Sequence, residues 1–177
     1  MAKLRRYAVP PTNKERPWAE DELIVSKTDT KGIITYANPV FLRLAQMSEQ
    51  DAIGTNHNVI RHPDMPRCVF KFLWDTISTG KEVFAYVKNM ATSGDYYWVF
   101  AHVTATYDDR GRITSYHSNR RKPKAEQIAK IEPVYKLLLA EEAKYDSPKD
   151  GLEASLALLI AFLKDKGMSY DEFIFTV

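Results

Sequence analysis

The sequence predicts an α+β fold, and the order of its local patterns carries that prediction. Two strand-like segments come first, several short helical segments and one longer helix follow, and three more strand-like segments then lie next to one another in the chain. Separate blocks of strands and helices are typical of α+β proteins, whereas strict alternation favours a parallel sheet. No internal repeat is visible.

The first two strands are predicted at residues 23–29 and 33–38. β-branched and aromatic residues dominate both segments, and the glycine-containing turn at 30–32 is short enough for a hairpin. Residues 1–22 precede them and are rich in charge and proline. We therefore expect an irregular or partly helical N-terminal cap, with Trp18 as its anchor on the body.

The connector to the next strands is predicted to be mostly helical. Pro39 opens a short helix over 40–47, and Ser48 is a suitable N-cap for a further turn. A longer helix follows Pro66, because its apolar residues recur on one face and Gly80 ends the pattern. Those apolar residues are Val69, Phe70, Leu73, Trp74 and Ile77.

The remaining strands are predicted at 82–89, 95–107 and 112–120. Polar turns that contain glycine separate them, at 91–94 and 108–111, so the three strands should form an antiparallel meander.

Two helices are predicted after the meander, at 124–144 and 151–167, with a linker at 147–151. The first carries an apolar seam at three- and four-residue spacing, and Pro133 should break or kink it. The second is apolar around most of its circumference, so it has to bury against the body or a second copy. The end, 169–177, is expected to add a short strand or to pack its phenylalanines. The seam of Ile128, Ile131, Tyr135 and Leu138, together with the apolar stretch 152–163, is a candidate interface for a homodimer.

Composition indicates an ordinary soluble domain with extensions. The 177 residues are 45% hydrophobic and 27% charged, and a net charge of +2 is too balanced to favour nucleic acid as a partner. One cysteine, Cys68, excludes an intramolecular disulfide and a multi-cysteine metal site. No secretory signal is visible, and the longest apolar run, 154–163, is about half a membrane span. We expect a cytoplasmic protein with no membrane insertion.

A cluster of polar residues stands out at 56–66, which reads NHNVIRHPDMP. Two prolines fix the backbone there and exclude a continuous helix, so Arg61, His62 and Asp64 are expected to project from a rigid corner. The guanidinium can hold a phosphate or ring carbonyls, and nearby asparagines offer donor and acceptor edges to a heterocycle. The same cluster also fits a purely structural corner that holds no ligand.

Four stretches resemble one protein family. HNVIRHPDMP at 57–66, FKFLWDTISTG at 70–80, VKN at 87–89 and GDYYWV at 94–99 are similar to the PAS sensor domain of bacterial aerotaxis receptors, which bind FAD. The resemblance runs from about Thr28 to Arg121 and extends into the helical segment at 128–136. It implies a PAS fold, in which a five-stranded antiparallel sheet carries short helices on one face and leaves a pocket for a flat ring. The implied organisation is an N-terminal cap at 1–22, a PAS sensor domain at 23–122 and a C-terminal helical extension at 123–177.

The resemblance also implies a flavin site. The residues expected to bind the cofactor or to support it are Asn38, His57, Asn58, Arg61, His62, Asp64, Trp74 and Asn89. Trp74 and Trp98 fit core packing at least as well as contact with a cofactor. At Val83 the sequence departs from the family, which commonly has a tryptophan there, so this position supplies no aromatic neighbour.

The implied function is a sensor of redox state or oxygen that holds FAD non-covalently and signals through dimer or partner contacts. FMN in place of FAD, and a ligand-free interaction module, are the alternatives. Haem is another, for which His57, His102 and His117 are available ligands. A light-driven flavin–cysteine adduct is not expected, because Cys68 lacks the sequence context of LOV domains. No catalytic triad, metal-ligand cluster or phosphate-binding glycine loop is visible, so we do not expect an enzyme.

Overall fold

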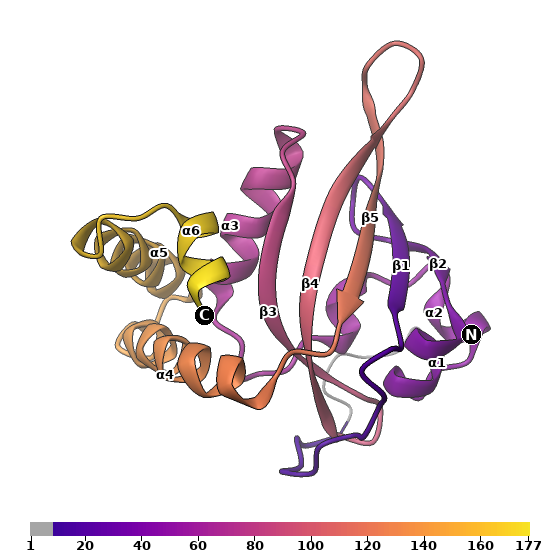
Figure 1. Cartoon of the computed structure of the whole chain (residues 1–177), viewed down its shortest axis with the longest axis horizontal. Helices are drawn as coiled ribbons and strands as arrows, with labels where there is room; N and C mark the ends of the chain where they lie inside the picture. Colours follow the sequence, from indigo (N-terminus) through magenta and orange to yellow (C-terminus); the bar gives the residue numbers. More distant parts are fainter. Residues whose placement is uncertain (1–8) are drawn as a thin grey trace.

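A computed structural model describes residues 9–177, and its centre is one antiparallel sheet of five strands (Figure 1). The strand order is β2-β1-β5-β4-β3, so the first hairpin and the later meander join through the pair of β1 and β5. This confirms the α+β prediction and the five-stranded sheet. The strands are β1 Ile24–Asp29, β2 Ile34–Ala37, β3 Val83–Met90, β4 Tyr96–Tyr107 and β5 Ile113–Arg121.

Helices connect the two halves of the sheet and follow it. The connector holds α1 Pro39–Ala45, α2 Glu49–Ala52, the 3₁₀ turn η1 His57–Ile60 and α3 Arg67–Ser78, and the C-terminal extension holds α4 Ala125–Glu142, α5 Pro148–Asp165 and α6 Tyr170–Thr176. Ser48 caps α2 by accepting a hydrogen bond from the Asp51 amide, as its position predicts. None of the helices in residues 9–177 combines the length and apolar character needed to cross a membrane.

The N-terminal segment lies along the body, as far as it is described. Its backbone pairs with the start of β4 through a bridge between Glu15 and Tyr96. Trp18 is buried, and its carbonyl accepts a hydrogen bond from the Lys122 ammonium. This fits the expected anchor. The part of the predicted cap at residues 1–8 lies outside the described residues.

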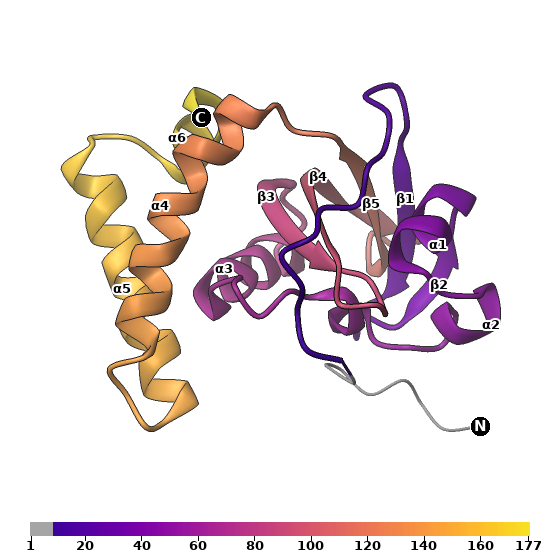
Figure 2. The same cartoon turned by 90° about the horizontal axis from the view of Figure 1, so that it is seen from below.

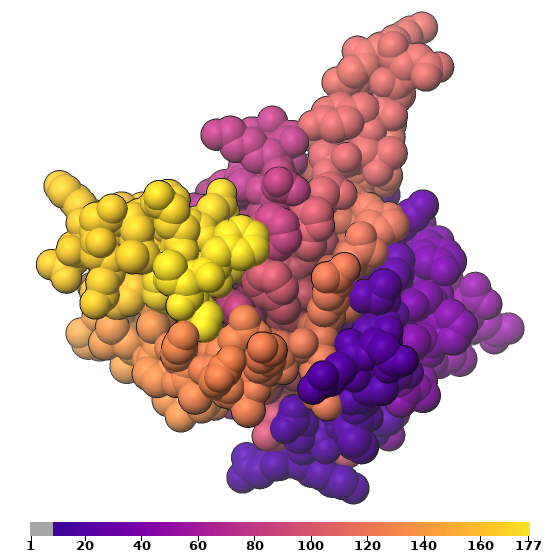
Figure 3. Space-filling view, viewed as in Figure 1, coloured from indigo at the N-terminus to yellow at the C-terminus, as the bar shows by residue number. Residues whose placement is uncertain are grey.

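The C-terminal helices form a lobe beside β3 and α3 (Figures 1 and 2). In the space-filling view this lobe is continuous with the sheet domain along β3 (Figure 3). The seam residues Ile131, Tyr135 and Leu138 are buried within the single chain. The seam that suggested a dimer interface is therefore already covered by the protein's own elements.

Three local features of this lobe differ from what the sequence predicts: a break at Pro133, a linker at 147–151 and a strand at the end of the chain are absent. Helix α4 runs without a break through Pro133. Pro148 opens α5, with Ser147 as its N-cap, so the residues predicted as a linker form the first turn of a helix. The last residues form α6 and add no strand, because Ser169 and Glu172 make a capping box that starts a helix. The alternative prediction, packing of the phenylalanines, is confirmed: Phe173 contacts Phe162 and Phe175 contacts Phe84.

Candidate functional site

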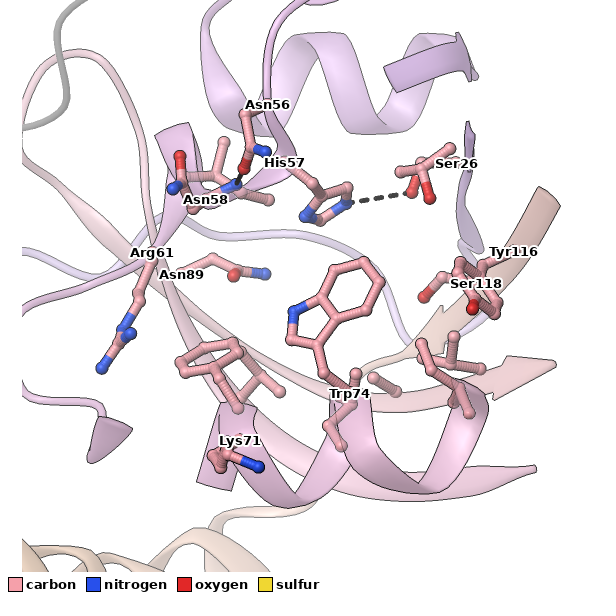
Figure 4. A pocket seen from close by; sticks show the side chains of 18 of the residues that line it. Ser26, Asn56, His57, Asn58, Arg61, Lys71, Trp74, Asn89, Tyr116 and Ser118 are labelled. Carbon is pink, nitrogen blue, oxygen red and sulfur yellow. Dashed lines mark hydrogen bonds between the residues drawn. The ribbon is translucent and has the colours of Figure 1, made fainter. Parts of the chain in front are cut away.

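A cavity of about 430 Å³ lies between the sheet, η1 and α3 (Figure 4). Its volume is within the range of roughly 300–1,000 Å³ that is usual for small-molecule sites. Residues from four strands face it, since every second residue of a strand points to the same side of the sheet. The lining residues are Ser26, Thr28, Lys31, Asn56, His57, Asn58, Ile60, Arg61, Arg67, Phe70, Lys71, Leu73, Trp74, Ile77, Val87, Asn89, Ala101, Val103, Tyr116, Ser118, Arg120 and Leu152.

The polar segment at 56–66 forms one rim of the cavity. Asn56 starts η1 by accepting a hydrogen bond from the Asn58 amide, and the backbone of Arg61 then pairs with that of Asn89 on β3. The guanidinium of Arg61 donates to the Met65 carbonyl at 2.8 Å and lies 4.3 Å from the centre of the Phe70 ring. The segment is therefore the rigid corner that the two prolines predict.

A buried polar group around Arg120 also lines the cavity. Nη2 of Arg120 donates to Ser26 Oγ and to His57 Nε2, at 2.6 Å each. Ser26 Oγ and His57 Nε2 are themselves 3.1 Å apart. Burial, together with the charge of Arg120, lowers the pKa of His57 to about 3, so this imidazole is neutral at physiological pH. Burial also lowers the pKa of Arg120, to about 10, which still leaves the guanidinium charged.

Three buried polar atoms at the cavity have no hydrogen-bond partner among the described residues. They are the amide nitrogen Nδ2 of Asn89, the hydroxyl Oγ of Ser118 and the guanidinium nitrogen Nη1 of Arg120. An unmade buried hydrogen bond costs roughly 1–3 kcal/mol, so such groups are rare unless a ligand or water completes them. All three side chains line one cavity, which indicates a ligand with acceptor atoms.

The charges around the cavity are all of one sign. Among the described residues, the lining contains no aspartate or glutamate. It contains five basic side chains: Lys31, Arg61, Arg67, Lys71 and Arg120. Of these, Lys71 is paired with Asp75 outside the cavity. A site of this kind favours an electron-rich or anionic ligand, because negative charge on the ligand offsets the buried cation.

Aromatic and aliphatic side chains supply the flat walls. Trp74 extends from α3 across the cavity in Figure 4, and its ring meets Tyr116 edge to face at 5.6 Å between centroids. The side chain is 36% exposed, more than a core tryptophan needs. Leu73, Ile77 and Val87 complete the apolar surface. Trp74 therefore lines the cavity, whereas Trp98 lies outside it and stacks on Tyr135.

Five of the eight predicted site residues line the cavity, and three lie elsewhere. His57, Asn58, Arg61, Trp74 and Asn89 are at the cavity. Asn38 caps α1 instead, where its side chain accepts from the amides of Phe41 and Val25. His62 is buried behind the rim and accepts from the Asp64 amide, while the Asp64 carboxylate points to solvent and pairs with Lys88 at 2.7 Å. These two support the corner.

Sequence reasoning did not identify Ser26, Ser118 and Arg120. One signal could have found them: in the predicted strands each falls at a position whose alternation with its neighbours points it toward the core. A serine or arginine on the buried side of a strand is uncommon and needs a reason. The strand register places Ser26 directly opposite Ser118, which brings the two strands' polar residues to one place.

The histidines and the cysteine considered for other cofactors lie away from the cavity, except for His57, which is already hydrogen-bonded. His102 stacks on Phe84 and His117 contacts Asn119, both away from the cavity, and Nε2 of His57 already accepts from Arg120. Cys68 is fully buried and does not line the cavity. Burial raises the pKa of its thiol to about 11. The described residues contain no cluster of three or more potential metal ligands.

Comparison with known proteins agrees with this geometry. A family model described as PAS fold matches residues 34–120. The aerotaxis receptor of Escherichia coli (strain K12) is 38% identical over 129 residues, which are 73% of this chain and 25% of the receptor. The nitrogen fixation regulatory protein of Klebsiella pneumoniae is 27% identical over 97 residues, which are 55% of this chain and 20% of that protein. The chain thus spans a quarter or less of the length of these relatives.

Solved structures share the fold. The light-state structure of the blue-light photoreceptor Aureochrome1 LOV matches with a TM-score of 0.54 at 21% identity, covering 71% of this chain and 93% of that one. A light-oxygen-voltage domain studied with a flavin analogue has a TM-score of 0.54 at 18% identity, covering 70% and 87%. At these identities the likeness concerns the fold alone. From the strand order, the family match and the identity to the receptor, residues 34–120 belong to the PAS family, in a domain of the aerotaxis-receptor type.

Proposed function

We propose that the protein is a sensor whose PAS domain binds FAD non-covalently and responds to its redox state or to oxygen. One observation carries the proposal: the cavity combines a flat apolar wall with buried polar groups that lack partners, and no acidic side chain is present in its described lining. The similarity to the aerotaxis receptor supports a sensor role of the same kind.

The residues present fit a flavin. An isoalloxazine ring is flat, with carbonyl oxygens and ring nitrogens along one edge, and it can lie against Trp74 and the aliphatic residues. Its polar edge would receive hydrogen bonds from the unpartnered donors of Asn89 and Arg120. The basic side chains of Lys31 and Arg67 line the cavity and suit the phosphates of FAD or FMN. When bound, a flavin supplies a ring system that takes up one or two electrons.

The protein's own residues set how that ring would respond. Arg120 is charged and buried, and His57 beside it is held neutral, so the local field is positive. A positive charge in a low-dielectric site favours any added negative charge on the ligand. We therefore expect Arg120 to make reduction of the bound ring easier, and Asn89 to fix the orientation of the ring. In this role the protein reports redox state and is not a catalyst.

A colour test decides between this proposal and a ligand-free PAS module. Purified protein should show the absorbance bands of oxidised flavin, and the released cofactor should migrate as FAD, not FMN, on chromatography. A Soret band would indicate haem instead. A colourless protein that gains no bands when FAD is added would refute the flavin assignment.

The residues are tested by a matched pair of asparagines. Asn89→Ala removes a buried amide from the cavity wall, and Asn119→Ala changes an exposed asparagine on β5 outside the cavity lining. We expect loss of flavin in Asn89→Ala, an unchanged flavin content in Asn119→Ala, and the same far-ultraviolet circular dichroism in both. Equal flavin content in the two variants would show that the cavity is not the site.

We further propose that output passes to a partner protein or a second copy of the chain. The seam of α4 is covered within the chain, so a dimer would need other residues. Ile160 on α5 and Leu137 on α4 are 56% and 50% exposed, respectively, and are the candidates on this lobe. Analytical ultracentrifugation of the full chain tests this, with Ile160→Asp expected to weaken a dimer that uses α5.

A further inference from the structure

Helix α3 is capped by a residue that lies far away in the sequence. Its own N-cap, Pro66, provides no side-chain hydrogen bond. Glu142, the last residue of α4, takes that place: its Oε1 accepts from the amide of Arg67 at 2.6 Å and from that of Cys68 at 3.3 Å. A carboxylate at this position satisfies two free amides and interacts favourably with the positive end of the helix dipole.

Two features of α5 hold the Glu142 carboxylate in place. The hydroxyl of the fully buried Ser155 lies 3.1 Å from the same oxygen and 3.0 Å from the Leu152 carbonyl, so its one proton is shared between these two acceptors. Gly151 lies so close to α4 that a Cβ built on it would be 2.7 Å from the carbonyl oxygen of Glu142. The cap is thus built by both helices of the C-terminal lobe, and it depends on how they pack together.

The capped helix is a wall of the cavity. Arg67, Phe70, Lys71 and Trp74, in the first two turns of α3, all line it, and α5 contributes Leu152 directly. Near the same point the Arg67 guanidinium donates to the Pro148 carbonyl at 3.3 Å. A shift at the start of α3 would therefore move both the cavity wall and the contacts that α3 makes with the C-terminal lobe.

We propose that Glu142 is a positioning residue through which ligand occupancy of the cavity and docking of α4 and α5 stabilise each other. The inference rests on the proposed flavin function for its ligand. A ligand packed against Phe70 and Trp74 fixes the first turns of α3, and these then present the two amides to Glu142 in the correct geometry. Because coupling between two binding events is reciprocal, a lobe held by Glu142 also raises the affinity for the ligand.

Other contacts keep the lobe attached when the cap is lost, so the effect can be separated from unfolding. Tyr135 of α4 donates its hydroxyl to the Tyr86 carbonyl on β3 at 2.6 Å, and both residues are buried. Phe72 of α3 packs on Tyr170, with ring centroids 4.3 Å apart. These contacts are independent of the carboxylate, and a Glu142 variant should fold with a loosened α3 start.

The test compares Glu142→Ala and Glu142→Gln with Glu141→Ala in the full chain. Glu141 is the neighbouring acidic residue, and its carboxylate pairs with Lys144, not with α3. FAD affinity is measured by titration, and hydrogen exchange of α3 and of α5 is followed with and without FAD. In the parent protein and Glu141→Ala, we expect FAD to slow exchange at the start of α3 and in α5.

In Glu142→Ala we expect affinity for FAD to fall about fivefold to tenfold, and exchange in α5 to become independent of FAD. Glu142→Gln keeps an acceptor without the charge, so an intermediate affinity is expected. A purely structural cap would give faster exchange in all states but the same response to FAD, and that result would overturn the inference. If the parent protein binds FAD but exchange in α5 does not respond, the inference on Glu142 is overturned and the flavin function stands. If the parent protein binds no FAD, both the inference and the flavin function are overturned.

Discussion

Mild acid should destabilise this protein through the neutral histidine of the cavity, His57. Its pKa is lowered from 6.5 to about 3 in the folded chain by burial and by the charge of Arg120. Well above pH 6.5 the ring is neutral in both the folded and the unfolded chain, so it has no effect on stability there. As the pH falls through 6.5, the unfolded chain binds a proton on this ring that the folded chain does not bind until a much lower pH. The free energy of unfolding therefore decreases.

The size of the effect follows from the two pKa values. At pH 5.0, some 1.5 units below the unfolded value, one such histidine lowers the free energy of unfolding by about 2 kcal/mol. His62, whose pKa burial and Lys88 lower to about 4, adds a similar amount. Against a typical total stability of about 5–15 kcal/mol, the combined loss of about 4 kcal/mol is large.

The assay is urea unfolding of the protein as purified, at pH 7.5 and at pH 5.0. His57→Gln keeps an acceptor near Arg120 and Ser26 but does not titrate, so its loss of stability between the two pH values should be about 2 kcal/mol smaller than that of the parent. His117→Gln, on the opposite face of the sheet, is the control and should lose as much as the parent. An equal loss in all three proteins would refute the reasoning on His57.

Three further predictions concern the walls of the cavity and the lobe. Gly32 has a φ of +78°, and a Cβ added there would lie 3.1 Å from the Trp74 ring, so Gly32→Ala should lower both thermal stability and FAD affinity. Gly111 is the control: its φ is +72°, but its surroundings are open, so Gly111→Ala should cost only about 1 kcal/mol of stability. Tyr135→Phe removes a buried hydrogen bond to β3 and should cost about 1–2 kcal/mol in urea unfolding. Arg120→Met should abolish flavin binding without lowering the stability of the cofactor-free chain, because it removes a buried charge that has no acidic partner in the cavity.

Local patterns predicted most of the elements, since each has a turn or cap signal of its own. The strands lie within one residue of their predicted limits, and α3 begins directly after Pro66. The end of the chain was harder, because Phe173 and Phe175 suit a strand as well as a helix. The capping pair Ser169 and Glu172 was the deciding signal, and it was available in the sequence.

The sequence predicted the cavity residues that lie on the proline-fixed segment, and it missed those that come together only through strand pairing. Arg61 and Asn58 lie on the proline-fixed corner, so their place followed from the chain itself. Arg120 and Ser26 meet only because β1 pairs with β5, across 94 residues of sequence. Asn38 shows the opposite error: an asparagine before a proline has an ordinary use as a helix cap, and that use is the one the structure shows.

Arg120 gives the strongest reason to regard the cavity as a binding site and not a packing defect. A guanidinium that is 4% exposed, with one nitrogen unpartnered and no carboxylate in the described lining, lowers the stability of the chain that carries it. The neighbouring groups relieve little of this cost, because Ser26 and the neutral His57 offer only uncharged acceptors. A ligand with electron-rich atoms beside Arg120 supplies what the protein lacks. The stabilisation that such a ligand provides would then be largest in the state that carries the most negative charge, and the proposed response to redox state rests on that dependence.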